Sequence, residues 1–170
     1  MLSRYLRIGP ECVALSRKLA GKPFVARDFG SQPAITFNMS HAHGRALIAV
    51  SQGQEVGVDL ERIRLDVEVE KLSERFFSPS EHATIMQSTQ EQRATKFFRY
   101  WVAKEAVLKA QGIGLQALSQ CEILLGTDGV ATEVLVPVGV RPETNWGVRP
   151  LPCGEGWEAA VAAQWLDWIV

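Results

Sequence analysis

Two carboxylates spaced two residues apart are the first groups in this sequence that could support chemistry. Asp59 and Glu61 lie in residues 56–61, whose alternation of apolar and acidic residues is typical of a β-strand. In a strand both carboxylates lie on one face, with Cα atoms about 6–7 Å apart. They repel each other unless a cation lies nearby. The alternative is a face exposed to solvent. Gly57 indicates that another segment approaches this backbone closely.

Glu105 and Lys109 form the second candidate group. They lie in a helical pattern over residues 91–111 that ends at Gly112. Steps of about 100° per residue place one stripe on a single side of this helix: Phe98, Trp101, Val102, Glu105 and Lys109. Because the aromatic part of the stripe must face a core, the two charges are directed toward the protein and need partners. They could pair with each other at i, i+4, or with charges on another element.

A third group surrounds a predicted hairpin. Residues 35–41 and 46–51 read as two strands joined by a short turn. Four polar residues lie around that turn: Ser40, His41, His43 and Arg45. Such a group suggests a phosphate site. Lys22, between Gly21 and Pro23, is either a solvated turn lysine or a contact to an anion.

The remaining pattern supplies the elements that position these groups. We expect a short amphipathic helix, or a helix and a turn, in residues 2–20, where Gly9-Pro10 interrupts the pattern. A second helix is expected to end at residues 75–77, and a short helix to begin at Ser78. Glu81 completes a capping box there, and this role alone accounts for it. Four later strands are predicted to form an antiparallel meander: residues 121–125, 131–136, 145–149 and 157–163. Trp165 and Trp168 are predicted to pack at its edge. The fold class is therefore α+β.

Composition restricts the function further. The chain has 170 residues, of which 46% are hydrophobic and 22% charged, and its net charge of −1 gives no support to a nucleic-acid surface. No apolar run reaches the roughly 20 residues of a membrane span, and the N-terminus is too polar for a secretory signal. Three scattered cysteines form neither a disulfide framework nor a zinc motif. We therefore expect a cytoplasmic protein.

Three ordered motifs resemble those of a known family. They are Phe37-Asn38-Met39-Ser40-His41, Gly57-Val58-Asp59-Leu60-Glu61 and Trp101-Val102-Ala103-Lys104-Glu105-Ala106-Val107-Leu108-Lys109. The set is similar to the 4'-phosphopantetheinyl transferase superfamily, and most similar to its surfactin-synthetase type. Gly21-Lys22-Pro23 and Phe76-Phe77-Ser78 with Glu81 fit the same pattern, so the resemblance extends from about residue 4 to about residue 165.

The resemblance implies an activity and a metal site. Members transfer 4'-phosphopantetheine from coenzyme A to a serine of an acyl or peptidyl carrier protein and release adenosine 3',5'-bisphosphate. Carried onto this chain, it implies that Asp59, Glu61 and Glu105 bind Mg²⁺, which prefers oxygen ligands. Glu105 is the favoured general base, directly or through a water, and Glu81 is a weaker candidate.

The same resemblance implies the contacts to coenzyme A. They are assigned to five residues: Lys22, Ser40, His41, Lys104 and Lys109. The last two are five residues apart and lie about 140° apart around the helix, so they cannot act in the same way. We favour Lys109, which also counts as a catalytic residue because it shares the face of Glu105.

The family's fold consists of two similar α+β halves related by a pseudo-twofold, with antiparallel sheets and coenzyme A between them. We expect a shortened first half in residues 1–52 and a complete second half, with the metal site, in residues 53–170. Either the chain starts at an internal methionine of a longer protein, or it is a natural short form, a monomer or a weak homo-oligomer. The alternative function is a catalytically weak or inactive homologue that binds coenzyme A or a carrier protein.

Overall fold

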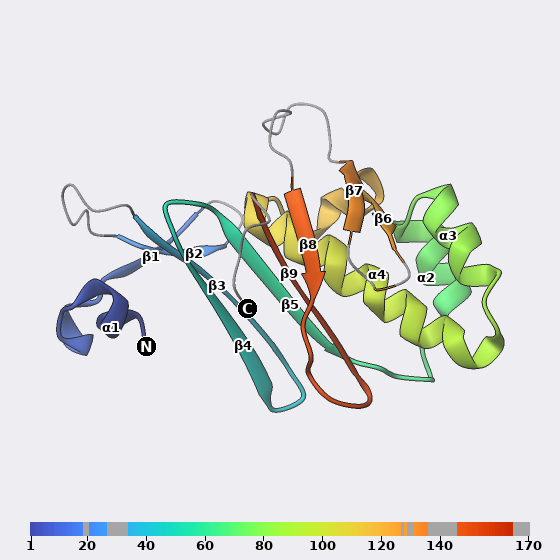
Figure 1. Ribbon diagram of the computed structural model, residues 1–170, viewed down its shortest axis with the longest axis horizontal. Coiled ribbons are helices and arrows are strands. Elements are labelled where there is room, and N and C mark those ends of the chain that lie inside the picture. Colours follow the sequence, from blue (N-terminus) through green and yellow to red (C-terminus); the bar gives the residue numbers. More distant parts are fainter. Residues whose placement is uncertain (19–20, 27–33, 127, 129–130, 136–145, 165–170) are drawn as a thin grey trace.

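The computed structural model describes residues 1–18, 21–26, 34–126, 128, 131–135 and 146–164. Helices and strands alternate irregularly along the chain, and the strands pair only antiparallel within these residues (Figure 1). The predicted α+β class with antiparallel sheets is confirmed. Trp165, Trp168 and residues 136–145 lie outside the described residues.

The helices of the fold are α1 (Leu2–Leu6), α2 (Val69–Phe76), α3 (Pro79–Met86) and α4 (Gln90–Gln111), with 3-10 turns η1 (Pro10–Cys12) and η2 (Leu115–Gln120). The strands are β1 (Leu15–Arg17), β2 (Pro23–Val25), β3 (Ile35–Ala42), β4 (Arg45–Gln52), β5 (Val56–Arg62), β6 (Glu122–Leu125), β7 (Ala131–Leu135), β8 (Trp146–Pro150) and β9 (Trp157–Gln164). Among the described helices, none combines the length and apolar character that a membrane crossing requires.

The central layer is a three-stranded sheet in which β9 lies between β5 and β8. Helix α4 packs along one face of this sheet (Figure 1), where its apolar residues join Val148, Ala160 and Ala162 in one core cluster. The opposite face of β5 is covered as well, because Val56 and Val58 pack against residues of β4. Residues 56–60 of β5 are buried as a result.

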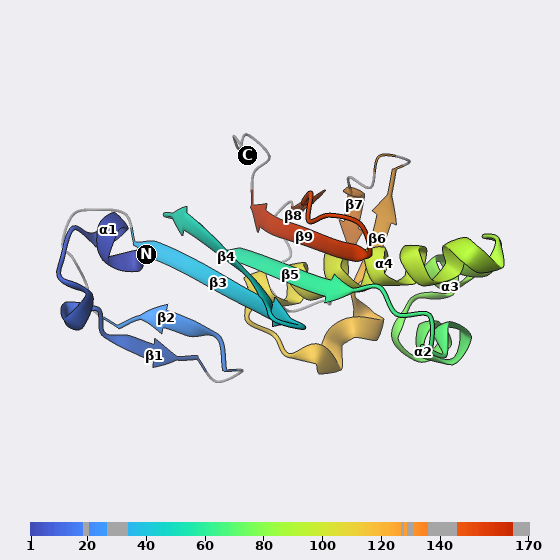
Figure 2. The same cartoon turned by 90° about the horizontal axis from the view of Figure 1, so that it is seen from below.

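The predicted hairpin of β3 and β4 is confirmed, with Ala42 opposite Arg45 next to the turn. Figure 2 shows β3 alongside β5. Two side chains of β3 join these strands: Asn38 Oδ1 accepts a hydrogen bond from Val58 N at 2.9 Å, and Ser40 Oγ accepts one from Leu60 N at 3.3 Å. The hairpin is therefore attached to β5 by side chains of β3 that accept hydrogen bonds from the backbone amides at the edge of β5.

Helix α4 begins and ends close to the predicted residues. Gly112 ends it in the left-handed conformation, with φ of 72°, which glycine adopts without a steric penalty. The capping box predicted at Ser78 is present at the start of α3. Aromatic residues of α4 pack against Phe77 between these two helices, and the Phe77 and Phe97 rings stack at 5.1 Å.

Two sequence-based predictions of structure are wrong. Residues 2–20 were predicted as a short helix or a helix and a turn. The helix ends at Leu6, and residues 15–17, whose leucine was assigned to the helical pattern, form strand β1 instead. The predicted four-strand meander is divided: β6 and β7 form a separate two-stranded sheet, whereas β8 and β9 join β5. Alternating hydrophobicity identifies a strand, but it does not identify the strand's partner.

Gly57 allows α4 to reach the backbone of β5. A Cβ at this position would lie 2.0 Å from Ala106 O and 2.4 Å from Ala110 N. These are backbone atoms of α4, which cannot move aside as the end of a flexible side chain can. The close approach that the glycine indicated in the sequence is therefore observed, and its partner is α4.

We expect Gly57→Ala to lower the free energy of unfolding by about 1–3 kcal/mol, because overpacking at a rigid contact forces the helix away from the strand. Chemical denaturation measures this change. Gly9→Ala is the matched control, since a Cβ there would meet the flexible carboxylate of Glu11 and should change stability little. Equal effects of the two substitutions would contradict a close backbone contact at Gly57.

Candidate active site

The site begins with three charged groups from β5 and α4. Lys109 Nζ lies 2.5 Å from Asp59 Oδ1 and 3.4 Å from Glu105 Oε2. Asp59 is 2% exposed, and Glu105 is also buried. The sequence left two possible partners for Lys109, a charge on its own helix or one on another element. Lys109 contacts both, Glu105 on α4 and Asp59 on β5. The Asp59 contact is the shorter one, so the strand supplies the stronger partner.

Ser40 adds a hydroxyl from the hairpin. Its Oγ donates a hydrogen bond to Asp59 Oδ1 at 2.7 Å and accepts one from Lys109 Nζ at 3.3 Å. Asp59 Oδ2 is buried and has no hydrogen-bond partner among the described residues. One oxygen of this carboxylate is thus saturated by the protein, while the other offers a free lone pair inside the site.

The carboxylates of the site destabilise each other's charged forms. Burial first, and then the charge of Asp59, raise the pKa of Glu105 to about 7, although Lys109 opposes this shift. Burial and the charge of Asp59 also raise the pKa of Glu61. Burial lowers the pKa of Lys109, but Asp59 and Glu105 outweigh burial and raise it overall. The site therefore has more negative charge than one lysine compensates.

A cavity of about 270 Å³ opens beside these groups. Glu105 and Lys109 line it from α4, Asn38 and Met39 line it from β3, and Lys22 lines it from the turn before β2. Backbone near the end of α4, at Gly112 and beyond, completes the wall. Segments far apart in the sequence thus meet at one concave surface, which is the usual location of a ligand.

Lys22 lies at this cavity, but its ammonium is already engaged. Nζ donates to Glu55 Oε2 at 2.7 Å, to Val56 O at 3.1 Å and to Ala110 O at 2.9 Å. An ammonium has three N–H donors, so these acceptors use all of them. Burial lowers the pKa of Lys22, and Glu55 only partly opposes this effect. In this structure Lys22 joins β5 to the end of α4 and leaves no donor for a phosphate.

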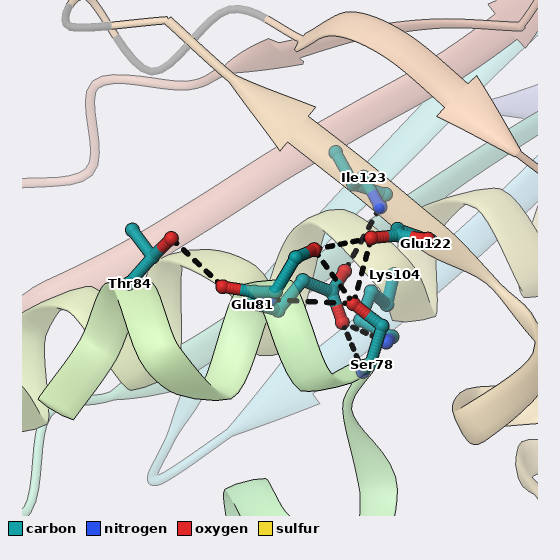
Figure 3. A network of polar contacts seen from close by, with 7 residues as sticks. Ser78, Glu81, Thr84, Lys104, Glu122 and Ile123 are labelled. Atoms are coloured by element: carbon teal, nitrogen blue, oxygen red, sulfur yellow. Dashed lines mark hydrogen bonds and ion pairs between the residues drawn. The ribbon is translucent and has the colours of Figure 1, made fainter.

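Lys104 is separated from the other candidate residues. Its side chain is fully buried, and Nζ lies 2.5 Å from Glu81 Oε2 on the side of α4 that faces α3 (Figure 3). Helix geometry directs the adjacent residues 104 and 105 to different sides of α4, and the contact of Lys104 with coenzyme A stays a prediction. Glu81, the weaker candidate for the general base, is buried in the same network and does not reach the cavity lining.

The hairpin residues do not gather at one point either. Ser40 contacts Asp59, whereas His41 is exposed on β3 and neither residue lines the cavity. His43 lies edge-on to the Trp157 ring at 6.4 Å, and the Arg45 guanidinium lies 4.3 Å above the same ring. Sequence reasoning missed Trp157 and assigned no role to Asn38, which holds β3 to β5.

The carboxylates suit a hard cation in their chemistry. Asp59, Glu61 and Glu105 supply only oxygen ligands, and the free Asp59 Oδ2 leaves a buried acceptor without a partner. Among the described residues, no group of three or more His, Cys, Asp or Glu side chains is arranged to hold a metal. Lys109 provides the compensating charge between Asp59 and Glu105 in this structure.

Comparison with known sequences extends this description. A family model described as the 4'-phosphopantetheinyl transferase superfamily matches residues 55–162. The 4'-phosphopantetheinyl transferase HetI of Nostoc sp. is 34% identical over 168 residues, which cover 99% of this chain and 68% of the relative. Sfp of Bacillus subtilis is 28% identical over 131 residues, covering 76% of this chain and 55% of Sfp. These matches span 55–68% of the relatives' own length.

Solved structures show the same fold. A holo-[acyl-carrier-protein] synthase of Thermotoga maritima has a TM-score of 0.52 at 22% identity, covering 64% of this chain and 61% of that one. A synthase of Bacillus anthracis, solved in complex with CoA (3',5'-ADP), has a TM-score of 0.53 at 17% identity, covering 64% and 93%. Because the family model matches more than half of the chain and HetI aligns with nearly all of it, this chain belongs to the 4'-phosphopantetheinyl transferase superfamily.

Proposed function

We propose that this chain transfers 4'-phosphopantetheine from coenzyme A to a serine of an acyl or peptidyl carrier protein and releases adenosine 3',5'-bisphosphate. The observation that carries the proposal is the meeting of Asp59, Glu105 and Lys109, two of which also line a cavity of about 270 Å³. Membership of the superfamily supports the class of reaction. The B. anthracis synthase, solved with CoA (3',5'-ADP), gives the fold a precedent for this nucleotide.

In this proposal, Asp59, Glu61 and Glu105 are the residues that would hold Mg²⁺. The positive charge of the ion would offset negative charge on the diphosphate of coenzyme A and on the adenosine 3',5'-bisphosphate that leaves. Burial first, and then the charges of neighbouring carboxylates, raise the pKa of Glu61 and Glu105, and the charge of the ion would offset the second of these causes. Asp59 Oδ2 is the buried acceptor that lacks a partner.

The protein's own residues then orient the reactants and move one proton. Lys109 is 29% exposed at its side chain and lines the cavity, so its ammonium can turn from Asp59 to a phosphate oxygen. Glu105 accepts the proton of the carrier serine, directly or through a water. The serine oxygen forms a bond to phosphorus as the bond to the adenosine bisphosphate breaks. Contacts of Lys22, Ser40 and His41 with coenzyme A remain predictions.

A second candidate is binding of coenzyme A or a carrier protein without transfer. The ion pairs of Lys109 favour it, because they already neutralise Asp59 without a metal. Incubation with coenzyme A, Mg²⁺ and several apo-carrier proteins separates the two functions by the mass of each carrier. Calorimetry with coenzyme A then identifies a binding protein that leaves every carrier unchanged.

We expect Asp59→Asn to reduce Mg²⁺-dependent transfer at least ~100-fold, because it removes the charge of a buried ligand while it keeps an oxygen for the Ser40 hydrogen bond. Mass spectrometry of the carrier protein measures the rate, and circular dichroism checks the fold. Glu133→Gln, on the exposed side of β7, removes a charge away from the site and should retain the rate. Full activity of Asp59→Asn would rule out its role as a ligand.

Stability without metal should depend on pH through Glu105. The pKa of a glutamate is ordinarily 4.5, as in the unfolded chain, and that of Glu105 is about 7 in the folded protein. Between these two pH values the folded chain holds a proton that the unfolded chain has released. Unfolding free energy therefore falls as pH rises through this window. A shift of this size corresponds to a loss on the order of 3 kcal/mol.

We expect Glu105→Gln to remove most of this fall, because glutamine has no proton to release. The difference in unfolding free energy between wild type and variant is measured by denaturation at pH 5 and pH 8 with a chelator. Glu74→Gln, exposed on α2, should follow the wild type. Parallel pH profiles of wild type and Glu105→Gln would show that burial of Glu105 does not penalise its charge.

A further inference from the structure

The closest approach between α4 and the central sheet is made by small residues, beside larger members of the same core cluster such as Leu108 and Val148. Gly57 on β5 faces the backbone at Ala106 and Ala110 of α4, and Ala160 and Ala162 of β9 belong to the same core cluster. Large side chains that interlock as ridges and grooves fix how a helix is rotated against its neighbour. Glycine and alanine allow a close approach, but they provide few such features. At the point of closest approach these small residues do little to fix the rotation of α4 about its axis, so a directional contact elsewhere on the helix would add to what fixes it.

Lys104 makes a directional contact on the other side of this helix. Its side chain is fully buried, with Nζ 2.5 Å from Glu81 Oε2 and 4.7 Å above the centre of the Phe77 ring. Figure 3 shows Lys104 and Glu81 within one network of polar contacts between α4, α3 and β6. Nothing in the reaction proposed above uses this pair.

Glu81 is held in place independently of Lys104. Its Oε1 accepts a hydrogen bond from Ile123 N of β6 at 2.8 Å, and its Oε2 accepts one from Ser78 N at 2.8 Å. The carboxylate is thus fixed by backbone donors of two elements before it meets the ammonium. Because the acceptor cannot shift freely, the position of Lys104 Nζ constrains α4 itself.

Buried ion pairs seldom add stability compared with apolar side chains of similar volume, since desolvation of both charges offsets their attraction. Their best-attested role is to select one arrangement among several of similar packing. We propose that the Lys104–Glu81 pair sets the rotation of α4 and thereby positions Glu105 and Lys109 opposite Asp59. Lys104 and Glu81 are positioning residues in this view, since neither touches the reacting groups.

The geometry of the site makes rotation costly. Side-chain atoms lie roughly 6 Å from the axis of a helix, so a rotation of about 20° moves them by about 2 Å. Lys109 Nζ is 2.5 Å from Asp59 Oδ1, and such a displacement would break this contact. A change at residue 104 would therefore act on Glu105 and Lys109 without any direct contact to them. For its effect on transfer, this inference rests on the proposed function.

The test replaces both partners, because Lys104→Met alone would leave a buried carboxylate without its cation and could prevent folding. Glu81→Gln combined with Lys104→Met keeps the volume and one side-chain oxygen, which can accept from either Ile123 N or Ser78 N. Two readouts are measured well below the melting temperature. One is the nuclear Overhauser effect between the Gly57 Hα protons and the Ala110 amide, which reports how α4 sits on β5. The other is kcat and KM for phosphopantetheine transfer.

We expect the double variant to fold, to lose most of the Gly57–Ala110 Overhauser effect, and to show a kcat at least ~10-fold lower with a smaller change in KM for the carrier. Ile85→Ala is the control: Ile85 is fully buried in α3, so the variant loses stability but should keep the Overhauser effect and kcat. An unchanged Overhauser effect in the double variant overturns the inference. If the wild type transfers nothing, the proposed function fails, while the Overhauser effect still decides the role of the pair.

Discussion

The close approach of α4 to β5 at Gly57 is the constraint on which the rest of the site depends. The face of β5 that carries Gly57 also carries Asp59 and Glu61, because side chains alternate along a strand. On α4, the residues in contact with Gly57 are Ala106 and Ala110, which directly follow Glu105 and Lys109. Contact between the two backbones therefore brings the charged groups together. A larger residue at position 57 would separate the very side chains that make the site.

This closeness creates an electrostatic cost. Burial and the charge of Asp59 raise the pKa of Glu105 to about 7, although Lys109 lies against both carboxylates. The protein therefore holds charge that its own groups do not fully neutralise. A site arranged to bind a cation and phosphates is expected to lower the stability of the empty protein. Charged groups that are directed toward a ligand cannot all pair with one another. The unpartnered Asp59 Oδ2 is consistent with this arrangement.

Local signals in the sequence predicted much of the fold. The capping box at Ser78, the glycine at the end of α4 and the alternation in β3 and β4 each depend on neighbouring residues, and each is observed. Strand partners depend on contacts between distant segments, so the division of the last four strands was not predicted. The same limit applies to the site. Helix geometry predicted that Lys109 could pair with Glu105. Its shorter contact with Asp59 and the packing of His43 and Arg45 against Trp157 depend on distant segments, so neither was predicted.

Three lysines around α4 show why residue type alone does not define function. Lys109, on the side of the sheet, compensates Asp59 at the rim of the cavity. Lys104, on the opposite side, meets Glu81, which the capping box of α3 and Ile123 N hold in place. Lys22, from another segment, uses its three donors on Glu55, Val56 O and Ala110 O, and so secures the end of the helix. Only the lysine whose ammonium is partly exposed can exchange a carboxylate for a phosphate at low cost, because a fully buried one would have to break contacts that hold the fold together.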